Sequence, residues 1–266
     1  MNFIMAAEKA SPFDKVIEHL SPHRYFWAPV WKVGGLDLSI SNAAVNIWAA
    51  AAIVLIMFSL AASKRSIVPA GIQNFMEASV DWLKTNIVYS VMSPADGQAW
   101  FPFIAAFFFF ILTMNTLGLI PFFGFTPTSN IFVTIALALM VYLTAVTIGI
   151  ARHGFFTFWK KTLLPPGIPG WLKGPMIGIE IVSQIARPFS LAVRLFANML
   201  ADHLLLLIFV GFIFLAGGIV AVVVVPVAMA FEVVFTAFGL FVGFIQAAIF
   251  AFLATLYIND ALHPGH

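Results

Sequence analysis

The chain has 266 residues, of which 62% are hydrophobic and only 9% are charged, whereas soluble domains carry about 25% charged residues. A water-soluble surface cannot be built from so few charges, so the composition excludes a soluble protein and predicts an integral membrane protein. The 13 Lys and Arg are balanced by 11 Asp and Glu, which excludes a basic patch for nucleic acid, and the absence of cysteine excludes disulfides and thiolate metal sites.

The first part of the chain predicts one membrane span and one interfacial helix. After a mixed N-terminal segment over 1–40, residues 38–63 carry no charge, and this stretch has the length of a single span, predicted over 43–62. The next segment, 70–98, repeats its apolar residues at helical spacing and carries its charges on other faces. This pattern is typical of an amphipathic helix that lies in the membrane interface.

The middle of the chain predicts two spans joined by a turn. Residues 97–151 carry no charge, and glycine and proline interrupt the apolar run between residues 118 and 127. We therefore expect spans over 99–118 and 130–151.

The last part of the chain predicts a hairpin of long helices. A basic loop from Arg152 to Lys173 precedes a long apolar run, with Gly217, Gly218 and Pro226 near its midpoint. We expect helices over 174–216 and 222–259, steeply tilted because each exceeds the roughly 20 residues of a straight crossing.

These elements predict an all-α membrane protein, a single integral membrane domain over 1–266 with about five transmembrane helices. Lys and Arg gather in the loops that follow the first and third spans, and the other short turns have none. By the positive-inside rule, the N-terminus and the segment 1–40 are predicted outside and the C-terminus inside.

The final hairpin carries charged residues inside the predicted membrane region. They are Glu180, Arg187, Arg194, Asp202 and Glu232. A charge at the centre of a membrane helix costs about 2.5–3.5 kcal/mol on the translocon scale. Five charged residues in one hairpin therefore indicate a structural or functional role. Structural ion pairs or snorkelling to the headgroups remain an alternative for Glu180 and Arg187, near a helix end, but fit Arg194 poorly because it lies in mid-helix.

Helical geometry arranges the polar side chains on two faces. At about 100° per residue, one stripe carries Glu180, Ser183, Arg187, Arg194 and Asn198, and His203 falls on the opposite face. If the hairpin turns at Gly217–Gly218, His203 and Glu232 lie at similar depth on the outer side and can face each other, as a pair suited to proton relay. A satisfied, buried histidine is the alternative. Gln246 lies nearer the depth of Arg194.

Polar groups thus form two half-paths. One leads from His203 and Glu232 on the outer side, with Asp202 beside His203, to mid-membrane, where Asn198, Arg194 and Gln246 lie. The other resumes at Ser183 and Glu180 on the inner side. Arg194 divides them, and since arginine cannot be deprotonated in proteins, it holds a carboxylate but passes no proton.

Three sequence stretches carry a family resemblance. They are GIEIVSQIARPFSLAVRLFANMLADHLLL, FIQAAIFAFLATLYINDALH and MNTLGLIP. They resemble the ATP synthase subunit a family, the stator of the membrane sector of the rotary F-type enzyme, in its proteobacterial and mitochondrial form. The resemblance runs from about Pro94 to the C-terminus, and its RLFxNM element is highly specific.

The resemblance implies a proton-translocating, non-catalytic subunit. Arg194 would be the essential stator arginine facing the c-ring carboxylate. Asn198, His203, Glu180 and Gln246 would match the family's other proton-path residues. Protons would enter an outer half-channel, neutralise a ring carboxylate, and leave through an inner half-channel past Glu180. Rotation of the ring would couple this proton flow to ATP synthesis.

The resemblance also implies partners and a location. The partners are the c-ring proteolipid, the peripheral-stalk b-type subunits, other ATP synthase subunits and membrane lipid, with no cofactor and no metal. The location is an energy-coupling membrane, either the bacterial or the mitochondrial inner membrane.

Two positions depart from the family pattern. Many relatives have a small residue where this chain has Asp202, and they commonly carry an acid seven residues before the glutamine, where this chain has Gly239. Our hypothesis is that Glu232, two further turns away on a similar face, replaces the acid that is missing at 239.

Other functions fit the sequence less well. A secondary transporter or ion channel built on the intramembrane Arg, His and Glu would show an internal repeat, which is not seen. A membrane enzyme with a histidine metal site is disfavoured because only His203 among six histidines lies deep in a span. A purely structural scaffold leaves Arg194 unexplained.

Overall fold

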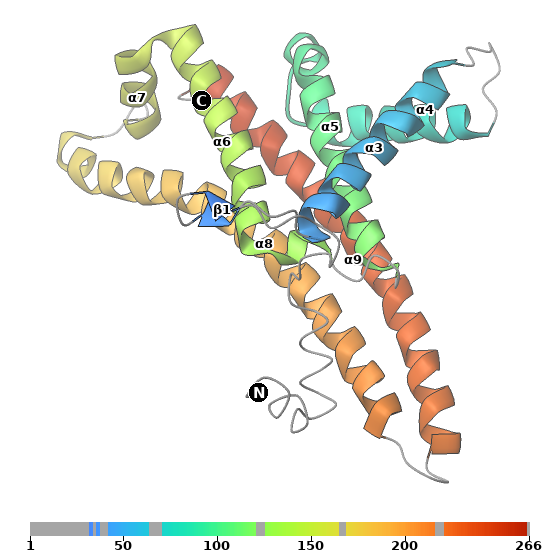
Figure 1. The fold of residues 1–266 in the computed structure, drawn as a ribbon. Coiled ribbons are helices and arrows are strands. Elements are labelled where there is room, and N and C mark those ends of the chain that lie inside the picture. The colour runs from blue at the N-terminus through green and yellow to red at the C-terminus, as the bar shows by residue number, and fades with distance from the viewer. Residues whose placement is uncertain are drawn as a thin grey trace.

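The computed structural model describes residues 32–33, 36–37, 42–63, 71–120, 126–164, 169–215 and 221–264. Most of the predicted N-terminal segment and the Gly217–Gly218 turn lie outside these residues. The described part is helical (Figure 1), apart from a short antiparallel pair formed by β1 (Lys32–Val33) and β2 (Leu36–Asp37).

Five helices are long and apolar enough to cross a membrane. They are α3 (Asn42–Ser63), α5 (Pro94–Gly118), α6 (Ile131–His153), α8 (Lys173–Leu215) and α9 (Ala221–Leu262). The predicted fold class is confirmed, including the long final pair. With 43 and 42 residues, α8 and α9 are each about 60 Å long. Each is therefore about twice as long as the roughly 30 Å thickness of the hydrocarbon core, and the predicted tilt would accommodate this length.

The interfacial helix is shorter than the predicted 70–98. Helix α4 (Ile72–Leu83) continues into a π-helical segment, η1 (Lys84–Val88), and the chain then turns into α5. Ser93 causes the break, because its hydroxyl accepts a hydrogen bond from the Asp96 amide at 3.3 Å and Pro94 occupies the first helical position. Both features begin a new helix.

A helix that the sequence analysis did not predict lies in the basic loop. Helix α7 (Phe155–Leu163) follows α6 after Gly154, whose φ of 79° lies in the region that favours glycine. Phe158 is buried against Gly149 of α6, where any side chain would collide with its ring. A short 3-10 turn, η3 (Gly170–Leu172), then leads into α8.

The core forms around α9, which contacts α5, α6 and α8. Small residues on α9, including Ala247, Ala251 and Ala254, are fully buried and let the other helices approach closely. Large rings fill the remaining space, as where Phe107 of α5 stacks on Phe250 with centroids 5.8 Å apart. In Figure 1, the α8–α9 hairpin extends beyond the other helices at the end opposite the C-terminus.

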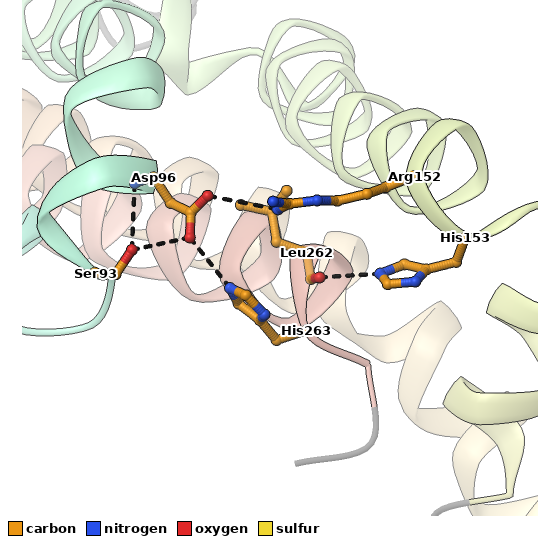
Figure 2. A network of polar contacts seen from close by, with 6 residues as sticks. All are labelled: Ser93, Asp96, Arg152, His153, Leu262 and His263. Atoms are coloured by element: carbon orange, nitrogen blue, oxygen red, sulfur yellow. Dashed lines mark hydrogen bonds and ion pairs between the residues drawn. The ribbon is translucent and has the colours of Figure 1, made fainter.

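A polar cluster ties three helix ends together near the C-terminus (Figure 2). We call it the terminal clamp; it consists of Ser93, Asp96, Arg152, His153, Leu262 and His263. The Asp96 carboxylate, in the first turn of α5, meets Arg152 at 3.4 Å and the His263 ring at 3.2 Å. His153 contacts the carbonyl of Leu262 at 3.0 Å. An acid at a helix start and bases at helix ends complement the helix dipoles.

Candidate functional site

Side-chain contacts fix how α8 and α9 lie against each other. Phe209 of α8 stacks on Phe231 and Phe235 of α9, with centroid distances of 5.6 and 5.2 Å. Nearer the C-terminus, Arg187 binds Asp260 at 3.1 Å. The two helices are therefore antiparallel neighbours along most of their length. Each predicted site residue on one helix can thus be placed at a level on the other helix.

Arg194 lies midway along α8 and points away from the helix packing. Its side chain is exposed, whereas the next residue, Leu195, is fully buried. No hydrogen bond or ion pair joins Arg194 to any residue that the structure describes. The guanidinium is permanently charged, so an exposed cation lies at mid-length of a largely apolar helix.

One turn further along α8, Asn198 contacts α9. Its amide nitrogen donates to the Gln246 side-chain oxygen at 2.8 Å, and Gln246 is 1% exposed. The Gln246 amide nitrogen is buried and has no hydrogen-bond partner among the described residues. A buried unsatisfied donor needs an explanation, such as a water molecule or a passing ligand.

Asp202 lies against Gly239, the position at which the family resemblance led us to expect an acid. A Cβ built on Gly239 would be 3.4 Å from the Asp202 Oδ2 atom and 3.1 Å from Leu119. The absence of a side chain at 239 therefore makes room for the Asp202 carboxyl. This Oδ2 atom is buried and lacks a hydrogen-bond partner within the described part of the chain.

His203 contacts η2 (Pro127–Ser129), the 3-10 turn before α6. Its Nε2 atom accepts a hydrogen bond from the Thr126 amide at 3.2 Å and lies 2.6 Å from the Thr126 hydroxyl. Because a backbone N–H only donates, Nε2 presents its lone pair to the Thr126 amide in this geometry.

Three further polar residues complete the same cluster and were not predicted as site residues. The Asn115 side chain donates to the Gly243 carbonyl at 3.3 Å and accepts from the Thr128 hydroxyl at 2.8 Å. Thr126 forms a hydrogen bond with His203. An available signal was the asparagine in the MNTLGLIP motif, because an amide inside an apolar span is costly unless it is bonded.

The α9 residues that these side chains contact lie on one face of the helix. Gly239, Gly243 and Gln246 are spaced four and three residues apart, which puts them on a single stripe. The two glycines let polar side chains from α5 and α8 reach the helix surface. We call the result the hairpin-side polar cluster; its members are Asn115, Thr126, Thr128, Asn198, Asp202, His203 and Gln246.

Glu232 was predicted on the outer path, but the structure does not bring it into this cluster. The stacking of Phe231 on Phe209 sets Glu232 at the level of Phe209, which is six residues beyond His203 on α8 and hence about 9 Å away along the helix. The predicted apposition of His203 and Glu232 is therefore wrong. It assumed equal distances from the Gly217–Gly218 turn, whereas aromatic packing sets a different register.

A second polar group lies toward the C-terminal end of the hairpin. The Glu180 carboxylate accepts from the Gln184 amide at 3.1 Å and lies 3.6 Å from the Arg187 guanidinium. Ser183 is half-buried and makes no hydrogen bond to a described residue. Among the residues described, no three His, Asp or Glu lie close enough together to hold a metal ion.

Comparison with known proteins identifies the family. The family described as ATP synthase A chain matches residues 44–259. The chain is 39% identical to ATP synthase subunit a of Methylobacterium sp. (strain 4-46), over 88% of this chain and 92% of that protein. It is 41% identical to the Chelativorans sp. (strain BNC1) protein of the same name, over 88% and 93%. The chain belongs to the ATP synthase subunit a family.

Membership of this family explains the apolar composition and the five membrane-spanning helices. A subunit a is a non-catalytic, multi-pass membrane subunit of the ATP synthase complex. The family match covers both polar groups and Arg194. In this member of the subunit a family, an exposed cation at mid-length therefore separates two polar groups that lie on opposite sides of it along α8.

Proposed function

We propose that this subunit a is the stator that offers two offset proton half-channels to the rotating c-ring, and so couples proton flow to ATP synthesis. One observation carries the proposal: Arg194 is exposed at mid-length of α8 without a hydrogen bond or ion pair to a described residue. A charge in this position is costly in lipid. A carboxylate on a neighbouring subunit would satisfy it.

The surface around Arg194 supports the c-ring as that neighbour. Ser190, Ala197 and Ala201 are exposed and lie four residues before, three after and seven after Arg194, which puts them on the same face. Small residues let membrane helices approach closely. A ring helix can therefore bring its carboxylate to the guanidinium, which favours the ionised form and blocks direct leakage.

The hairpin-side polar cluster serves as the outer half-channel in this proposal. His203, Asn198 and Gln246 supply groups that accept and donate hydrogen bonds, and two buried polar atoms in the cluster lack described partners. Asp202 supplies the acid that relatives commonly carry at 239, because its carboxyl fills the space left by Gly239. Glu232, nearer the hairpin turn, serves at the outer mouth.

The polar group at the C-terminal end serves as the inner half-channel. Glu180 and Ser183 lie on the stripe that leads to Arg194, at the end of the bundle where the basic side chains gather. The positive-inside rule supports an inner location for this end and an outer location for the N-terminus. The same proposal includes the b-type stalk and other synthase subunits as partners, in a bacterial or mitochondrial inner membrane.

Replacement of Arg194 tests the proposal. We expect Arg194→Ala to abolish ATP-driven proton pumping by the assembled complex in inverted membrane vesicles, because no other group holds the ring carboxylate. Lys160→Ala, which removes an exposed cation of α7, is the control and should leave pumping unchanged. Subunit composition is checked in both purified complexes. Retained pumping in Arg194→Ala would refute the proposed mechanism.

A further inference from the structure

Helix α7 combines lysines with exposed aromatic side chains. Lys160 and Lys161 lie in its last turn, and both are exposed. Phe156 is 85% exposed, and its neighbour Phe155 is exposed as well. Because Phe156 and Lys160 are four residues apart, they lie on the same face of the helix. Large exposed apolar side chains beside lysines are typical of a helix that lies at a membrane surface.

The packing of α7 holds it where α6 leaves the membrane region. Helix α6 is a candidate span of 23 residues, and α7 begins two residues after α6 ends at His153. Phe158 is buried against Gly149, so α7 folds back beside the last turns of α6 (Figure 1). Helix α7 also contacts α8. Because a span of this length ends near the lipid headgroups, α7 lies at the level of the headgroups.

The 3-10 turn η3 and the start of α8, which follow α7 in the chain, expose the same types of residue. Trp171 is 79% exposed, and Lys173, the first residue of α8, is also exposed. Tryptophan is enriched at membrane interfaces, where its ring lies at the level of the headgroups. We call these aromatic and basic residues the interfacial surface; its members are Phe155, Phe156, Lys160, Lys161, Trp171 and Lys173.

The three lysines of the interfacial surface have no carboxylate partner among the described residues, because none of them forms an ion pair there. No Asp or Glu occurs between Asp96 and Glu180 in the sequence. Asp96 is already paired with Arg152 and His263. Glu180 is already paired with Arg187. The positive charge of the interfacial surface is therefore open to an anionic partner.

We propose that the interfacial surface binds anionic phospholipid in the leaflet at this end of the bundle. The lysines contact the headgroup phosphates, and Phe156 and Trp171 lie among the upper parts of the acyl chains. The exposed rings favour a lipid over a free anion, because a free anion would be bound by the lysines alone. The proposal is independent of the stator function, since the interfacial surface contains no residue of either proposed half-channel. Lysines that are solvated and only set the orientation of the chain are the competing explanation.

Lipid selectivity measured beside α7 separates the two explanations. The chain has no cysteine, so a fluorescent dye can be attached at Thr157→Cys, which is exposed on α7, or at Ile120→Cys, an exposed control position after α5. The assembled complex is reconstituted in phosphatidylcholine nanodiscs with a small fraction of lipid that carries quenching bromine atoms on its acyl chains. The brominated lipid is either phosphatidylglycerol or phosphatidylcholine, and the complex without an introduced cysteine gives the background.

We expect the dye at Thr157→Cys to show a preference for brominated phosphatidylglycerol over brominated phosphatidylcholine of at least about fivefold, the contribution of one lysine near an anionic surface. At Ile120→Cys the two lipids should quench alike. Lys160→Gln combined with Lys161→Gln should remove most of the preference, whereas arginine at both positions should keep it. Salt at about 1 M, where the Debye length is about 3 Å, should also lower the preference.

Each outcome supports or overturns the proposal. Equal quenching by the two lipids at Thr157→Cys overturns it, as does a preference that survives the loss of both α7 lysines. A dye at Thr157→Cys that neither lipid quenches would show that another subunit covers α7, which also overturns it. If the glutamine variant fails to assemble, the salt dependence measured with the lysines in place decides. None of these results bears on the stator function, which pumping by the Arg194→Ala complex tests separately.

Discussion

Arg187 and Arg194 illustrate how two identical residues on one helix stripe come to differ in role. They are seven residues apart, which separates them by about 20° around the helix and about 10 Å along it. Arg187 is held by Glu180 and Asp260, whereas Arg194 is exposed and makes no ion pair with a described residue. Arg187 therefore forms the structural ion pair that the sequence analysis kept as an alternative. Of the two arginines, Arg194 is the one whose guanidinium is available to a carboxylate on another subunit.

At the same scale, Asp202 and Glu232 are the two candidate acids of the proposed outer half-channel. We expect Asp202→Asn to lower ATP-driven proton pumping about 100-fold, the lower end of what removal of a proton-transfer group costs. Glu232→Gln should cause a smaller loss, because only Asp202 lies against Gly239 within the polar cluster. Fluorescence quenching of a pH-sensitive dye in inverted vesicles measures both variants.

Asn is close in size to Asp, so the packing against Gly239 and Leu119 is kept in the Asp202→Asn variant. Equal amounts of assembled complex in the two variants serve as the control. A larger loss in Glu232→Gln than in Asp202→Asn would return the role of the missing acid to Glu232.

At the scale of elements, the sequence predicted what depends on length and apolar content. The charge-free stretches and the turn residues gave five spans and the final hairpin. The start of α5 was missed because the Ser93 cap overrides the continuous helical pattern of 70–98, and α7 was missed because it is short and lies in a basic loop.

The polar contacts between elements could be predicted only in part. Asn198 and Gln246 were expected at similar depth, and they form a hydrogen bond. His203 forms a hydrogen bond with Thr126, which comes from a turn far away in sequence and was not expected. The register of α8 against α9 depends on how Phe209 packs, and helical periodicity within one chain segment contains no information about that contact.

The contact between η2 and α5 positions His203, and it can be tested at Gly118. A side chain on Gly118 would overlap the Thr126 hydroxyl, so Gly118→Ala should displace Thr126 and the His203 ring that it holds. We expect a destabilisation of about 1–3 kcal/mol, as for other overpacked cores, together with slower proton pumping.

Gly178→Ala is the matched control, because Gly178 also lies within a helix and nothing lies within 4 Å of a Cβ built there. The readouts are the temperature at which the subunit dissociates from the complex and the pumping rate. If the Gly118→Ala and Gly178→Ala variants had the same dissociation temperature and the same pumping rate, close packing of Thr126 against Gly118 would not be needed.

At the scale of the whole molecule, charge is segregated between the two ends of the bundle. The terminal clamp, the basic residues of α7 and the Arg187–Asp260 ion pair all lie at the end that holds the C-terminus. The opposite end, around the turn that follows α5, has no Lys or Arg. This asymmetry supports the proposed orientation, in which the end that holds Arg187 and Asp260 faces inward and the hairpin-side polar cluster faces outward.

Single cysteines at the two ends test this orientation. Thr157 on α7 and Ile120 after α5 are both exposed. Because the chain has no cysteine of its own, a cysteine introduced at either position would be the only one. With a membrane-impermeant maleimide, Thr157→Cys should react in inverted vesicles and Ile120→Cys in right-side-out vesicles, because the lysines next to Thr157 favour the inner side. The opposite pattern would exchange the inner and outer half-channels, so that Asp260 and Glu180 would face the side from which protons enter during synthesis.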